Sequence, residues 1–106
     1  MSEQRAGLIH TVYFWLQPDL DEAARRDFEQ GVARLAAVPG VLHFYAGPPA
    51  KTIEREVTDH SFDYSLHLFF ADVAAQEHYQ DHPIHLQFVA EQAAKFATVK
   101  VYDNAL

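Results

Sequence analysis

Residues 8–16 are apolar almost without interruption, and this stretch limits what the chain can fold into. Side chains alternate between the two faces of a strand. The two faces predicted here carry, respectively, Leu8, His10, Val12, Phe14 and Leu16, and Ile9, Thr11, Tyr13 and Trp15. A strand that is apolar on both faces has to be buried on both faces. Because 106 residues suffice for one modest core, we expect a single domain, residues 1–106 with a core at about 8–103.

The rest of the chain alternates between helical and strand patterns. A helix is predicted to begin near residues 19–22, where Asp19 suits an N-cap with Glu22 three positions on, and to stop before Pro39-Gly40. A second helical stretch breaks at Pro83, which suits the first turn of a new helix. The further predicted segments are strands at 41–46, 62–71 and 97–102, helices at 72–81 and from 83 to about 96, and a polar loop at 51–61. In the strand at 62–71, one face is predicted to carry Phe62, Tyr64, Leu66, Leu68 and Phe70.

This order, β-α-β-β-α-β, predicts an α+β, ferredoxin-like protomer whose four-stranded antiparallel sheet has helices on one face. The other face would then carry an exposed apolar set from the first and third strands. Its members are Ile9, Tyr13, Trp15, His67 and Phe69. Soluble monomers rarely expose a patch of this kind. We therefore predict a homodimer in which two copies pack through the open sheet face about a two-fold axis.

Composition excludes several partners and compartments. The net charge of −7 argues against nucleic acid and anionic membranes as partners. The absence of cysteine removes disulfides and thiolate chemistry. Residues 1–7 lack the apolar core of a signal peptide, and no apolar run approaches the roughly 20 residues that span a bilayer. We expect a soluble, cytoplasmic protein.

Residues 78–88 concentrate groups that can move protons near neutral pH, with three of the seven histidines and a tyrosine. His78, His82 and His85 would share one face of a continuous helix, as the ligands of a metal site could. Pro83 interrupts that helix, so we predict no metal site. The chain also lacks a phosphate loop and a dinucleotide fingerprint. No cofactor is therefore expected.

Several short motifs follow one another in a definite order along the chain. They are Ile9-His10-Thr11-Val12, Val38-Pro39-Gly40-Val41, a strand ending in Phe70 and Asp72, and Tyr79 followed by His82-Pro83-Ile84-His85-Leu86-Gln87-Phe88. Together they resemble the stress-responsive dimeric α/β-barrel (Dabb) family from about residue 8 to residue 103. The resemblance implies a ferredoxin-like protomer whose sheet pairs with that of a second protomer. Members include a plant olivetolic acid cyclase and a plant hydroxynitrile lyase, which use no metal or organic cofactor.

The resemblance also implies site residues. In the cyclase, a first-strand histidine, the tyrosine before the motif and the second motif histidine carry catalysis; by motif position these are His10, Tyr79 and His85. A neutral histidine base with a tyrosine donor suits proton abstraction beside a carbonyl, cyclisation or cyanohydrin-type cleavage. The cyclase has a tyrosine on its first helix where this chain offers Gly31 and Val32, which implies a differently shaped cavity.

Each of these residues also has a structural interpretation. His10 fits a hydrogen-bonded core histidine, and a bond between Tyr79 and His85 could serve the fold alone. His82, placed before a proline, suits a helix start. Phe88 is expected in the pocket wall, and Gly31 is expected either to permit close packing or to open space beside the pocket.

Three functional hypotheses follow. The first is a pocket between sheet and helices that binds a small apolar molecule with a carbonyl or phenol group, and that carries out cofactor-free acid–base catalysis. The second is a non-enzymatic, stress-responsive binding or structural protein in which the same residues hold the fold. The third is a cofactor-independent, monooxygenase-like activity on an aromatic substrate.

Overall fold

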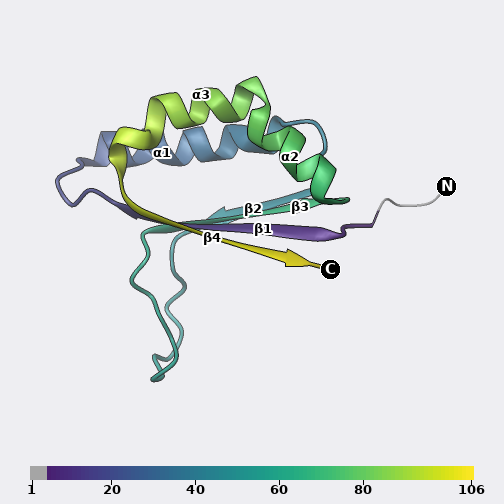
Figure 1. The fold of residues 1–106 in the computed structure, drawn as a ribbon. Helices are drawn as coiled ribbons and strands as arrows, with labels where there is room; N and C mark the ends of the chain where they lie inside the picture. Colours follow the sequence, from purple (N-terminus) through teal and green to yellow (C-terminus); the bar gives the residue numbers. More distant parts are fainter. Residues whose placement is uncertain (1–4) are drawn as a thin grey trace.

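The computed structural model describes residues 5–106 as a four-stranded antiparallel sheet with three helices on one face (Figure 1). The elements are β1 (Leu8–Leu16), α1 (Glu22–Arg34), β2 (His43–Gly47), β3 (Tyr64–Phe70), α2 (Val73–Asp81), α3 (Pro83–Gln92) and β4 (Phe96–Ala105). Short 3-10 turns follow α1 at Leu35–Ala37 and α3 at Ala93–Lys95. The predicted ferredoxin-like order is confirmed. Residues 1–4 lie outside the described residues. They belong to the segment 1–7, which is predicted to lack the apolar core of a signal peptide.

Strand β1 lies inside the sheet, whose order is β2-β3-β1-β4. It pairs with β3 from Leu8↔Phe70 to Phe14↔Tyr64. It pairs with β4 along its other edge, starting at Leu8↔Ala105. A central strand is enclosed by neighbouring strands along both edges, and its side chains are largely covered on both faces. This position explains why residues 8–16 are so apolar. None of the helices in residues 5–106 is long and apolar enough to cross a bilayer.

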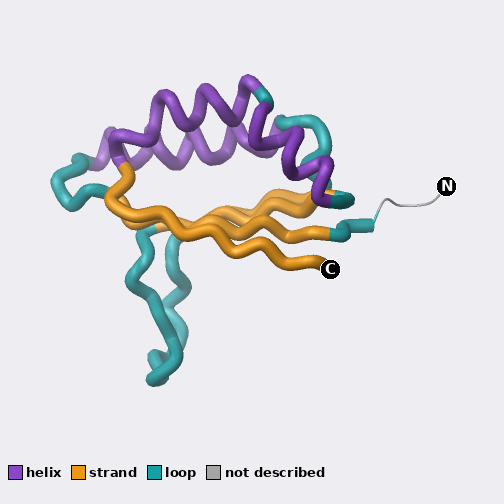
Figure 2. Tube along the Cα trace, viewed as in Figure 1, coloured by secondary structure: helices purple, strands orange, loops and turns teal. Residues whose placement is uncertain are grey.

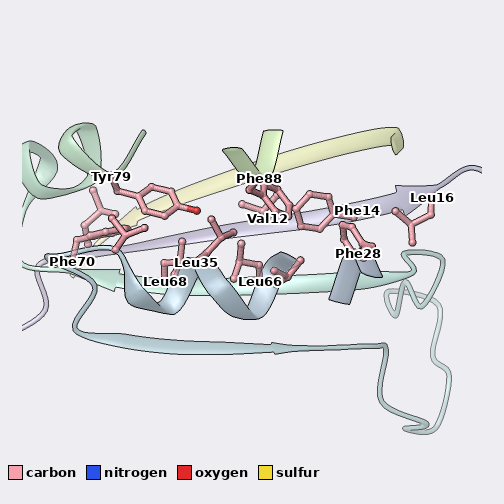
Figure 3. Packing of buried hydrophobic residues seen from close by; sticks show 13 residues of the cluster. Val12, Phe14, Leu16, Phe28, Leu35, Leu66, Leu68, Phe70, Tyr79 and Phe88 are labelled. Carbon is pink, nitrogen blue, oxygen red and sulfur yellow. The ribbon is translucent and has the colours of Figure 1, made fainter. Parts of the chain in front are cut away.

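The core lies between the sheet and the helices (Figure 3). Phe14 of β1 contacts Phe28 of α1 and Phe88 of α3 edge-on, with ring centroids 5.1 Å and 6.1 Å away. The helical period of α1 places Phe28 and Val32 on one face, and both are 0% exposed. Burying such a side chain stabilises the fold by about 1.5–3 kcal/mol relative to leaving it exposed.

The opposite side of the sheet, which we call the open face, has no helix over it (Figure 2). Strand register assigns its residues, which are Ile9, Thr11, Tyr13, Trp15, His43, Tyr45, Ser65, His67, Phe69, Thr98, Lys100, Tyr102 and Asn104. The five side chains predicted to form an apolar set all lie on this face, and each is partly exposed in the protomer.

Helix starts follow side-chain caps, with one difference from prediction. α1 is capped by Asp21, whose carboxylate accepts from the backbone N–H of Ala24 at 2.8 Å, rather than by Asp19. Asp19 instead lies in a turn over residues 17–20, which a bond from Leu20 N to Gln17 O closes. His82 caps α3, because its Nδ1 accepts from the N–H of Ile84 at 3.1 Å. The predicted break between two helices at Pro83 is therefore confirmed.

The limits of three strands differ from prediction, and β2 lies at His43–Gly47 rather than at 41–46. β4 runs to Ala105 rather than to 102, since its pairing with β1 continues to Leu8. β3 begins at Tyr64, and Phe62 does not share the helix-facing side as predicted. Its ring lies edge-on against Tyr13 on the open face, with centroids 4.9 Å apart. The chain is not yet held in the ladder at Phe62, so strand alternation does not apply there.

Gly31 serves close packing between helices, the first of its two predicted roles. A Cβ at this position would lie 2.8 Å from Nε2 of Gln92, which is 1% exposed. That amide donates to the Asp27 carboxylate at 3.2 Å, and Lys95 donates to both Asp27, at 2.7 Å, and Gln92, at 2.8 Å. A polar network that is buried at Gln92 and exposed at Asp27 thus joins α1 to the end of α3.

We predict that Gly31→Ala lowers the free energy of unfolding by about 1 kcal/mol, because crowding Gln92 outweighs the helix propensity that alanine gains. In a Gln92→Ala background the same substitution should instead stabilise by about 1 kcal/mol. Chemical denaturation in both backgrounds measures this reversal of sign. Gly47→Ala, where no atom lies within 4 Å of the added Cβ, is the control. If Gly31→Ala stabilises the protein that keeps Gln92, the packing role of Gly31 is contradicted.

Candidate functional site

A pocket of about 290 Å³ lies between the sheet and helices α2 and α3. Most of its wall is apolar and consists of Val12, Phe14, Leu35, Leu66, Phe88, Val89, Phe96, Val99 and Val101. Its polar residues are His10, Gln76, Tyr79, Gln80, His85 and Asp103. The polar set gathers at one end, where the start of β1 and the end of β4 meet α2. The pocket therefore suits a small ligand with one polar group.

The mouth of the pocket follows β4. Val99 and Val101 lie across from Phe14 and Val12 of β1 and share their helix-facing side. They nevertheless remain 41% and 49% exposed, because β4 is the edge strand and the helices do not cover it. A ligand can enter here without a helix having to move.

Tyr79 is held at the polar end by α2 and by aromatic neighbours. It is 1% exposed, and its ring centroid lies 5.9 Å from that of His10 and 4.8 Å from that of His85. Its hydroxyl points along the sheet toward Val12 and Phe88 (Figure 3). Burial raises the pKa of Tyr79 well above its ordinary value, so the phenol stays protonated. Tyr79 is therefore a hydrogen-bond donor at any physiological pH.

His85 lies in the first turn of α3 and bonds back to the end of α2. Its Nδ1 lies 3.0 Å from the backbone carbonyl of Gln80. A carbonyl only accepts, so Nδ1 carries the proton and Nε2 of the neutral ring keeps a free lone pair. Burial is the main cause that lowers the pKa of His85, with the charge of His10 adding to it. The Gln80 bond and Asp81 oppose the shift. His85 is therefore a neutral base near pH 7.

His10 is paired with a carboxylate that we did not predict. Strand register places His10 directly across from Asp103, and Nδ1 lies 2.5 Å from Oδ1. His10 is 5% exposed, whereas the Asp103 side chain is 48% exposed. The carboxylate accepts, so Nδ1 donates, and in the neutral form of the ring Nε2 is the nitrogen with the lone pair. Asp103 fixes the tautomer and ring orientation of His10, as the aspartate does in hydrolase triads.

A sequence signal for Asp103 existed in the alternation of β4. Val99 and Val101 continue to position 103 on the same face, opposite a strand that begins with a buried histidine. Ending the predicted strand at residue 102 concealed this pairing. His10, Tyr79 and His85, named as one set from sequence, do lie together in the pocket.

The remaining predicted residues separate. Phe88 lines the pocket, whereas His82 acts at the helix start, as its position before Pro83 suggested. Gly31 does not line this pocket but a smaller cleft between α1 and α3. Within residues 5–106, no group of three or more histidine, cysteine, aspartate or glutamate side chains is arranged to hold a metal ion.

Comparisons with known proteins agree with the ferredoxin-like fold of the chain. Residues 8–105 match the family model of the stress responsive A/B barrel domain, Dabb. No curated protein sequence matches the chain. A dimeric ferredoxin-like protein of unknown function from Thermobifida fusca is 20% identical, with a TM-score of 0.79 over 100% of this chain and 96% of its own.

Two further solved structures share the fold. A Dabb family protein from Mesorhizobium loti is 24% identical, with a TM-score of 0.76 over 96% of this chain and 98% of its own. A hydroxynitrile lyase from Passiflora edulis is 16% identical, with a TM-score of 0.78 over 93% of this chain and 92% of its own. The family model spans nearly the whole chain, including both strands that hold the His10–Asp103 pair. The chain belongs to the stress responsive A/B barrel domain (Dabb) family.

Proposed function

We propose that the pocket binds a small, mostly apolar molecule with a carbonyl or phenol group and transfers a proton beside that group without a metal or organic cofactor. One observation carries the proposal. A protonated tyrosine and two histidines, each with a free Nε2 when neutral, meet at the only polar end of an otherwise apolar pocket. Such a site can place a base beside an activated carbon and a donor beside the oxygen.

Each side chain has a distinct role in this proposal. Nε2 of His85 removes the proton, since burial keeps this ring neutral. The hydroxyl of Tyr79 donates to the carbonyl oxygen and stabilises the negative charge that develops there. The His85 imidazolium then returns that proton to the product, and His10, held by Asp103, accepts a proton from the substrate oxygen or returns one to it through Nε2. A positioned base typically contributes about 10²–10⁴-fold to the rate, and an oxyanion donor about 10²–10³-fold.

Family membership and fold support a cyclase- or lyase-like reaction. The structure from Passiflora edulis is a hydroxynitrile lyase, and cleavage of a cyanohydrin also needs a base, which takes the hydroxyl proton as the bond between carbon and cyanide breaks.

We also propose that two copies associate through the open face. Aromatic side chains of this face, such as Tyr45 and Tyr102, remain more than half exposed in the protomer. Tyr13, Phe69 and His67 lie among them. The helices cover only one face of the sheet, so a second layer is needed to cover the open face. Two solved structures with this fold are described as dimeric.

We predict that the protein accelerates exchange of the protons between the two carbonyl groups of acetylacetone or benzoylacetone with solvent deuterium. His85→Gln should reduce the catalysed rate at least about 100-fold because it removes the base. Tyr79→Phe should reduce it about 10²–10³-fold by removing only the donor. Proton NMR in D₂O measures the loss of signal over time.

The matched control is His78→Gln, an exposed histidine of α2 outside the pocket, which should exchange at the rate of the unsubstituted protein. Thermal melting of the three variants separates loss of chemistry from loss of fold. Exchange that stays at the buffer rate with the unsubstituted protein, or that survives His85→Gln intact, would sink the proposed reaction.

The rate of exchange should depend on pH through His85. A base works in its neutral form, so kcat/KM rises with pH through the pKa of His85 and is constant above it. Because that pKa is lowered from 6.5, the rise should be centred below pH 6.5. The plateau should then extend to about pH 9, since the raised pKa of Tyr79 keeps the donor protonated. A rate profile, together with an NMR titration of the histidine rings, measures this. A rise centred above pH 6.5 would contradict it.

We predict that the protein sediments as a dimer at micromolar concentration and that Phe69→Glu makes it a monomer. The substitution places two carboxylates in the proposed interface, where charge is unfavourable without a partner. Sedimentation velocity over a dilution series measures the change. Val73→Glu, on the exposed side of α2, is the control and should leave the dimer intact.

A further inference from the structure

The connection between β2 and β3, residues 48–63, forms an arm that leaves the sheet on the side away from the helices (Figure 2). Loops longer than about 12–15 residues without regular structure are uncommon in compact domains and are usually functional. The arm also makes the protomer extended. Its radius of gyration is 14.6 Å, whereas a compact chain of this length is expected at about 13 Å.

The arm is fixed to the protomer only at its base. Phe62 contacts the Tyr13 ring, and Ser61 Oγ accepts from Nε1 of Trp15 at 3.1 Å. Asp63 accepts from the N–H of Leu16 at 2.7 Å. Two of these contacts are with open-face side chains, so the base of the arm is continuous with that face.

Beyond the base, the hydrogen bonds of the arm are within the arm. Thr52 and His60 bond across its two legs at 3.0 Å, between Oγ1 and Nε2. At the tip, Thr58 donates its N–H to the carbonyl of Arg55 at 2.9 Å and accepts from the N–H of Arg55 at 3.2 Å. These bonds give the arm a defined shape, but they do not bury its apolar side chains.

Two aliphatic side chains near the tip are the most exposed large hydrophobic residues of the described chain. Ile53 is 89% exposed and Val57 is 79% exposed. Packed against a second surface, they would gain the hydrophobic contacts that the protomer itself does not offer. A surface on the open-face side of the sheet is the one they can reach (Figure 1).

Charge favours a second copy of this chain as that surface. The net charge is −7, so two copies repel each other through most of their surfaces. The open face, however, includes no aspartate or glutamate, and its one formal charge is Lys100. In the outer part of the arm, residues 51–58, the charges of Lys51, Glu54, Arg55 and Glu56 sum to zero. Asp59 and Asp63, nearer the base, give the whole arm a net charge of −2, and Asp59 lies beside Lys100 of the open face. The open face and the outer part of the arm, residues 51–58, thus carry little net charge and can approach a second copy of an acidic protein with little repulsion.

The length of the arm fits the same partner. Packed sheets lie about 10 Å apart. Each leg of the arm has about seven residues, which span at most roughly 23 Å when extended. Two copies packed face to face would therefore each lie beside the other's arm.

We propose that the arm, residues 48–63, clasps the second copy of the chain and packs Ile53 and Val57 against the flank of the partner. The inference rests on the proposed homodimer and adds an element to it. By two-fold symmetry, each interface receives two arms and buries four aliphatic side chains.

The test is the dimer dissociation constant, measured by sedimentation velocity over a dilution series. Ile53→Ser with Val57→Ser should raise Kd at least about 100-fold, which is about 2.8 kcal/mol at 1.4 kcal/mol per tenfold. The matched control replaces two other exposed aliphatic residues, Val73→Ser with Leu86→Ser, on the helical side of the protomer. Its Kd should stay within about twofold of the unsubstituted protein.

The outcomes distinguish failure of the arm proposal from failure of the homodimer proposal. If the unsubstituted protein is a monomer, the homodimer fails and the arm proposal fails with it. If it is a dimer that Phe69→Glu dissociates, but the arm variant keeps the original Kd, the arm proposal alone is overturned. Hydrogen exchange supplies a measurement without an arm variant. Amides of residues 51–58 should exchange more slowly in the dimer than in the Phe69→Glu monomer, and equal exchange would overturn the arm.

Discussion

The pairing of β1 with β3 on one edge and β4 on the other is the constraint on which the rest of the structure depends. It places a strand that is apolar on both faces in the interior of the sheet, so one face must meet the helices and the other is left for a different layer. The same register fixes His10 across from Asp103 and Tyr13 across from Lys100. Core, site and open face are therefore set by one alignment of strands.

The break between α2 and α3 joins fold and chemistry in a similar way. Pro83 ends one helix and begins the next, which leaves the carbonyl of Gln80 without a helical partner. His85 satisfies that carbonyl through Nδ1, and the bond determines which ring nitrogen can act as a base. His82 satisfies the opposite deficit by accepting an N–H at the start of α3. A hydrogen-bonding requirement of the backbone has thus oriented the two histidines differently.

Sequence patterns predicted the local features well, because periodicity and helix stops act over a few residues. The helix break at Pro83 and the set of His10, Tyr79 and His85 could be recognised in this way, the latter through the order of family motifs. Alternation along β4 indicates the face of Asp103, but the pairing with His10 could not be recognised, since the two residues are 93 positions apart and are brought together by strand register. The role of Gly31 depended likewise on Gln92 of a distant helix. Phe62 departed from prediction because its aromatic contact lies outside the ladder.

Strand β4 follows every other element along the chain, yet it supplies one wall of the pocket and the carboxylate that holds His10. During synthesis, the helices and the other three strands leave the ribosome before Asp103 does. A nascent chain can therefore begin to assemble its core with His10 in place but without the acceptor that selects its tautomer. In this molecule the polar end of the pocket is complete only when an edge strand aligns with one that was made first.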